Sequence, residues 1–83
     1  MAGIDEFLTY LQAEKRYAQL TIKAYKNDLN QFHAFCQENG SESMDLHDKA
    51  IRSWVVSLMN AGFSSRTVHR KLTSLRTYCK FLI

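Results

Sequence analysis

The chain has 83 residues, 46% of them apolar, and its 11 Lys and Arg outnumber its 8 Asp and Glu to give a net charge of +3. This length holds one small domain with a single modest core, and the absence of proline argues against a Pro-rich linker. No run approaches the ~20 apolar residues of a membrane span, and residues 1–6 lack the basic start and apolar core of a signal peptide, so we expect a cytoplasmic protein.

The first half of the chain contains two amphipathic helical patterns. Ile4, Phe7, Leu8 and Leu11 have helical spacing and predict a first helix that ends near Lys15 or Arg16. A second helix is expected from about Leu20 to Glu38, and Asn39-Gly40 provides residues that tolerate a left-handed turn at its end. The apolar positions of this second helix are Ile22, Tyr25, Leu29, Phe32 and Cys36.

The second half contains two more such patterns. After a polar loop at residues 41–44, Asp45 is expected to cap a third helix, with Asp48 three residues further on, and Gly62 is expected to end it. Ser64 is then expected to cap a fourth helix, with Thr67 at the third position along. The predicted buried faces are Ile51, Trp54, Val55 and Leu58 on the third helix and Val68, Leu72, Leu75, Cys79 and Leu82 on the fourth.

Short connections between four helices, with no strand pattern and no internal repeat, predict an all-α fold, a compact four-helix bundle. The fourth helix stays apolar and periodic up to Ile83 without a capping signal. We therefore expect residues 1–83 to be a single domain cut from a longer protein at a domain boundary.

The positive charge is segregated along the chain. Residues 62–83 carry five Lys or Arg and no acid, and residues 15–27 also lack acids while containing Lys15, Arg16, Lys23 and Lys26. On the fourth helix, Arg66, Arg70, Lys71 and Ser74, with Thr67 beside them, are spaced to share a flank away from the apolar stripe. Such a strip suits a phosphate backbone, and this grouping favours nucleic-acid binding more than the net charge does.

Metal, cofactor and disulfide chemistry have little support in the sequence. Cys36 and Cys79 both fall on apolar stripes and are interpreted as reduced core residues. His33 precedes Cys36 by three residues, but no second ligand pair stands at a zinc spacing, and the three glycines are solitary. We expect no cofactor, no metal site and no small-molecule ligand.

Aromatic residues at helical spacing are interpreted as packing groups. The four tyrosines, of which Tyr25 lies on an apolar stripe, have no Arg and His constellation nearby that would favour a nucleophile. Trp54 is expected at the centre of the core rather than as a base-stacking platform. For Arg76 two interpretations remain open, pairing with an acid or facing DNA.

Two segments carry a resemblance to a known family. The pattern Thr21-x-x-Ala24-Tyr25-x-x-Asp28-Leu29, followed by Gly62-Phe63-Ser64-x-x-Thr67-Val68-x-x-Lys71-Leu72-x-x-Leu75-Arg76, resembles the N-terminal core-binding domain of tyrosine recombinases of the phage-integrase and Xer type. The match spans nearly the whole chain. It implies a SAM-like helical domain that clamps double-stranded DNA at a recombination site, together with further copies of the recombinase.

The resemblance also implies which residues contact DNA. In this family the second and fourth helices lie against DNA, with their N-terminal halves toward the major groove and neighbouring phosphates. The expected DNA-binding residues are Thr21, Lys23, Ala24 and Asn27 on the second helix and Arg66, Thr67, Arg70, Lys71 and Ser74 on the fourth.

Two departures from the family pattern affect this expectation. Ala18 and Leu20 stand where the family commonly has a Ser that caps the second helix and an Asn just before the Thr. The catalytic motifs of the family, a tyrosine nucleophile flanked by Arg and His, also lie beyond this chain, so we expect no DNA cleavage by these residues.

The alternative function is a helical protein-interaction module with Phe63, Phe81 and Ile83 as partner contacts. A stand-alone enzyme is the third and least favoured interpretation.

Overall fold

A computed structural model describes residues 3–40 and 46–82. Its helices are α1 (Ile4–Ala13), α2 (Gln19–Glu38), α3 (Asp48–Asn60) and α4 (Ser65–Leu82). All regular elements in these two ranges are helices, which confirms the predicted all-α class. The expected loop at residues 41–44, the Asp45 cap and Ile83 fall outside the described residues.

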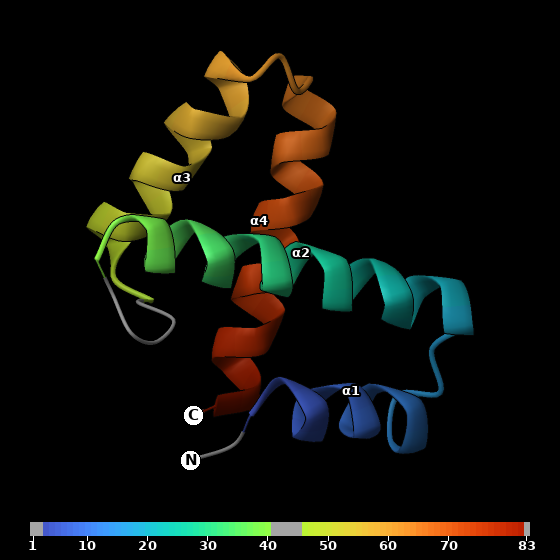
Figure 1. Ribbon diagram of the computed structural model, residues 1–83. Coiled ribbons are helices and arrows are strands. Elements are labelled where there is room, and N and C mark those ends of the chain that lie inside the picture. Colours follow the sequence, from blue (N-terminus) through green and yellow to red (C-terminus); the bar gives the residue numbers. More distant parts are fainter. Residues whose placement is uncertain (1–2, 41–45, 83) are drawn as a thin grey trace.

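The longest helix, α2, forms the centre of the fold. It contacts each of the other three helices, while α3 also contacts α4. In Figure 1, α4 passes behind α2, so that the N-terminal part of α4 lies on the α3 side of α2 and its C-terminal part lies on the α1 side. The crossing of α2 and α4 therefore joins the two halves of the domain.

Aromatic side chains fill the core on both sides of this crossing. Phe7 of α1 packs against Tyr25 of α2 and against Tyr78 and Phe81 of α4, with ring centroids 5.1 to 5.9 Å apart. On the α3 side, the Phe32 and Trp54 rings lie 5.1 Å apart. The predicted core position of Trp54, which is 2% exposed, is confirmed. The fully or nearly buried apolar residues are Phe7, Leu11, Leu29, Phe32, Cys36, Trp54, Leu58, Val68, Leu75 and Tyr78.

Most of the predicted helix ends agree with the structure. Gly62 has a φ of +95° and follows α3, where the Phe63 amide donates to the Leu58 carbonyl oxygen at 3.1 Å and the Gly62 amide donates to that of Met59 at 3.1 Å. These two hydrogen bonds form a Schellman motif, which only a residue with a left-handed conformation can complete. Gly40 plays a similar part after α2, with a φ of +90°.

Two other predicted ends differ from the structure. Helix α1 ends at Ala13 with Glu14 as its C-cap residue, one residue before the expected Lys15, and Arg16 takes a left-handed φ of +54° in the reversal toward α2. Helix α3 begins at Asp48 with His47 as its N-cap residue. Asp48 is thus the first helical residue and cannot hold the third position of a capping box.

The buried face of α4 differs from the predicted stripe. Val68 and Leu75 are buried as expected, but Leu72, Cys79 and Leu82 are only half-buried. The remaining buried positions of α4 are Lys71, Ser74 and Tyr78. Relative to the predicted stripe, the buried face of α4 is therefore turned toward α2, because Lys71 and Ser74 donate hydrogen bonds to Asp28 of that helix.

Ser64 caps α4 as predicted, and its removal should have a measurable cost. The Ser64 hydroxyl oxygen accepts a hydrogen bond from the Thr67 amide at 3.2 Å. We predict that Ser64→Ala lowers the free energy of unfolding by about 1 kcal/mol, because it leaves an amide of the first turn without a partner. Urea denaturation followed by circular dichroism measures this loss. The matched control is Ser65→Ala, the next residue, which should change stability by less than ~0.5 kcal/mol; equal effects of the two variants would contradict the cap.

Candidate nucleic-acid interface

A buried carboxylate on α2 organises the polar side chains of α4. Asp28 is 1% exposed, because it lies one helical turn from both Tyr25 and Phe32 on the core-facing side of α2. Its Oδ2 accepts hydrogen bonds from Arg70 Nη1 and from Ser74 Oγ, both at 2.7 Å. Its Oδ1 accepts one from Lys71 Nζ at 3.0 Å. The carboxylate thus has three donors, which compensates for the loss of its hydration.

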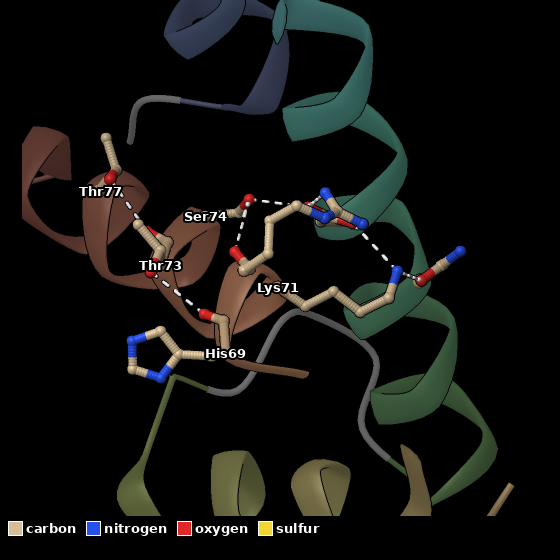
Figure 2. A network of polar contacts seen from close by, with 8 residues as sticks. His69, Lys71, Thr73, Ser74 and Thr77 are labelled. Atoms are coloured by element: carbon tan, nitrogen blue, oxygen red, sulfur yellow. Dashed lines mark hydrogen bonds and ion pairs between the residues drawn. The ribbon is translucent and has the colours of Figure 1, made fainter. Parts of the chain in front are cut away.

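Lys71 is fully engaged inside the domain. Its side chain is 4% exposed, and in addition to Asp28 its ammonium donates to Gln31 Oε1. The same nitrogen lies 5.5 Å from the centre of the Phe63 ring, a cation–π contact. Figure 2 shows the Lys71 side chain extended from α4 toward α2, with Ser74 one turn further along α4.

Arg70 differs from Lys71 in being only partly covered. Half of its side-chain surface is exposed, although Nη1 is bound to Asp28. Two cations around one carboxylate leave this cluster with a net charge of +1. Arg70 therefore presents a positive charge to solvent, and its bond to the buried Asp28 restricts the orientation of the side chain.

The predicted surface strip of α4 is accordingly wrong in two positions. Lys71 and Ser74 were expected to point away from the core, but the structure buries both against Asp28. The physical reason is that an acid on the core-facing side of α2 requires buried donors opposite it, and these residues supply them. Arg66 is exposed as expected, whereas Thr67 is half-buried and its hydroxyl accepts a hydrogen bond from Ser64 Oγ at 3.1 Å.

The N-terminal half of α2 and the middle of α4 form a groove. On the α2 side it is lined by Leu20, Thr21, Ala24 and Tyr25, and on the α4 side by Arg70, Thr73 and Ser74. The groove thus brings together four of the nine predicted residues, Thr21, Ala24, Arg70 and Ser74. Lys23, Asn27 and Arg66 are exposed but do not line it.

Sequence reasoning missed Asp28, Leu20 and Thr73 as parts of this region. Asp28 carried a signal that could have been used, namely an acid among the apolar positions of α2. Thr73 matched neither the apolar stripe nor the basic strip of α4, and in the structure its hydroxyl donates to the His69 carbonyl oxygen at 3.1 Å within the same helix.

The described residues show no grouping suited to a metal or to nucleophilic chemistry. No cluster of three or more His, Cys, Asp or Glu occurs among them. Burial raises the pKa of the Cys79 thiol, which therefore stays protonated at neutral pH. Burial, with smaller contributions from the nearby Cys79 and Glu6, also raises the pKa of Tyr78. Neither side chain is activated as a nucleophile.

None of the helices described here has the length and apolar content that crossing a bilayer requires.

Removal of the Asp28 charge should destabilise the whole domain. We predict that Asp28→Asn lowers the free energy of unfolding by about 3 kcal/mol, because it leaves the buried Lys71 ammonium without an anion. Chemical denaturation measures the change, with Asp5→Asn on the exposed face of α1 as the control that removes the same charge. A loss below ~1 kcal/mol would show that the buried cluster does not stabilise the fold.

Comparison with known proteins places the chain in a family. Residues 4–83 match the family model described as the phage integrase N-terminal SAM-like domain. Over 80 residues the chain is 39% identical to the tyrosine recombinase XerC of Oceanobacillus iheyensis, covering 95% of this chain and 26% of that protein. It is 31% identical over 83 residues to the tyrosine recombinase XerD of Rickettsia bellii, covering 100% of this chain and 27% of that protein. No solved structure matches the chain significantly.

The chain therefore spans about a quarter of the length of the curated relatives that it matches. These 83 residues correspond to the N-terminal SAM-like domain and do not include the catalytic domain of the recombinases. The resemblance inferred from the two helical motifs is confirmed, and the chain belongs to the tyrosine recombinase family as its phage-integrase N-terminal SAM-like domain.

Proposed function

We propose that this domain binds double-stranded DNA and clamps a recombination site while a catalytic domain of the same recombinase carries out strand transfer. The recombinase would assemble on DNA with further copies of itself, in the cytoplasm. The observation that carries the proposal is the groove between α2 and α4, which has an anchored and half-exposed Arg70 in its wall.

The anchoring of Arg70 supports a binding role on energetic grounds. A free arginine side chain loses up to ~2 kcal/mol of conformational entropy when it is fixed on a ligand. The bond between Nη1 and the buried Asp28 has already restricted the guanidinium in this domain. Arg70 is thus preorganised, and its remaining donors suit a phosphate or the edge of a guanine base.

Exposed cations lie on both helices that form the groove. Lys23 lies on α2 and Arg66 on the first turn of α4, and both are exposed. The first turn of α4 contains no acid, and the N-terminus of a helix attracts phosphate oxygens. These charges would supply most of the affinity, and the groove would supply contacts to bases.

A protein-interaction module remains the alternative function, and one observation favours it. A second apolar groove lies between α3 and α4 and includes Ile51, Val55, Leu72 and Cys79. Of the partner contacts expected for this function, Phe63 is 43% exposed. Phe81, however, is half-buried, with its ring centroid 5.3 Å from that of Phe7. This alternative would be supported if the domain showed no affinity for DNA and instead formed a complex with a protein whose stability did not depend on salt.

The salt dependence of binding tests the proposal. If about five phosphates are neutralised, the logarithm of the binding constant for a fluorescent duplex should fall with log salt at a slope near −4.5. Lys23→Ala and Arg66→Ala should each make the slope shallower by about 0.9 if each contacts one phosphate. Lys49→Ala on α3 removes an exposed cation away from the groove and should leave the slope unchanged. The absence of binding even at low salt would refute the proposal.

Base recognition by Arg70 gives a second test. With a duplex selected from a randomised pool, Arg70→Lys should keep most of the affinity for random DNA, because the charge remains. It should lose about 1–3 kcal/mol of preference for the selected duplex, because the compact ammonium lacks the planar, fixed pair of donors that a guanidinium presents to guanine. Competition titrations measure the ratio of the affinities for the selected and the random duplex. An equal loss on both duplexes would restrict Arg70 to phosphate contacts.

A further inference from the structure

Leu20 is an apolar side chain that the fold does not use. It is 82% exposed, more than the other exposed large apolar residues in the described ranges 3–40 and 46–82, which are between 38% and 57% exposed. It lies on the first full turn of α2, on the opposite side of the helix from the fully buried Leu29. Packing of the domain therefore does not explain a leucine at this position.

The position of Leu20 relative to the groove is specific. Leu20 and Ala24 are one helical turn apart, and both line the α2 wall of the groove that contains Arg70. At Leu20 and Ala24 the α2 wall presents carbon atoms, beside the hydroxyl-bearing Thr21 and Tyr25, while the opposite wall presents the cation anchored on Asp28. One wall is thus suited to apolar contact and the other to hydrogen bonds or phosphate.

The chemistry of the DNA major groove offers one matching apolar group. Each base pair presents donors and acceptors there, but only thymine, among the unmodified bases, presents a methyl group. Apolar side chains on a helix in the major groove recognise thymine by contact with this methyl group.

We propose that Leu20, supported by Ala24, is a specificity-determining residue that recognises a thymine methyl group in the major groove of the bound DNA. The inference rests on the proposed DNA-binding function and adds to it a defined base preference. It also gives a role to Leu20, which stands where the family commonly has an Asn. Burial of one methyl group predicts a preference of about fourfold for thymine over uracil at the contacted position.

The exchange of thymine for uracil tests this inference, because uracil lacks the methyl group but keeps the same pairing and the same O4 acceptor. The probe is a short duplex selected by the 83-residue chain from a randomised pool and resynthesised with deoxyuridine at each thymine in turn. We expect one position at which uracil weakens binding about fourfold. Leu20→Ala should bind the thymine and uracil duplexes equally, and it should bind the uracil duplex nearly as well as the unchanged chain does.

A matched control and the opposing outcomes complete the design. Val56→Ala shortens an aliphatic side chain that is 57% exposed on α3, away from the groove, and should keep the fourfold preference. Binding with no thymine preference, or with a preference that survives Leu20→Ala, would overturn the inference and leave the DNA-binding function intact. Failure of the chain to bind any duplex at low salt would instead refute the proposed function, and the inference with it.

Discussion

The fold depends on the need to compensate one buried carboxylate. Asp28 lies within the core-facing surface of the central helix, where an isolated charge would cost several kcal/mol. Arg70, Lys71 and Ser74 of α4 supply the donors, and all three contacts are short. Because these donors must face α2, the orientation of α4 about its own axis is determined by polar contacts as well as by its apolar residues.

The same interaction divides the cations of α4 into two kinds. Lys71 is enclosed between Asp28, Gln31 and the ring of Phe63, so it acts within the domain. Arg70 is anchored by one nitrogen and remains half-exposed. A stabilising contact and the orientation of a surface cation thus share one carboxylate, and a change at Asp28 would affect both stability and binding. Substitutions on the exposed side of the groove separate these two effects.

The groove and the buried ion pair both bring together residues from the two helices that carry the recognisable motifs. One motif places Thr21 and Ala24 on the first half of α2, and the other places Arg70, which the motif itself leaves open, in the middle of α4. Asp28 belongs to the first motif and Lys71 to the second, so each motif contributes one partner of the buried ion pair. A pattern that was recognised by resemblance therefore has a physical basis in the crossing of α2 and α4.

The sequence by itself determined most of the local structure. Helical spacing of apolar residues predicted four helices, and Ser64, Gly40 and Gly62 marked helix ends that depend on neighbouring residues only. Only the tertiary structure decided which face of α4 is buried and which cations remain at the surface. Asp28 is 42 to 46 residues away from its partners along the chain, and a helical period measured on one helix contains no information about a donor on another. The apolar stripe therefore predicted that Leu72 and Cys79 are buried. In the structure Lys71 and Ser74 are buried instead, because they compensate the charge of Asp28.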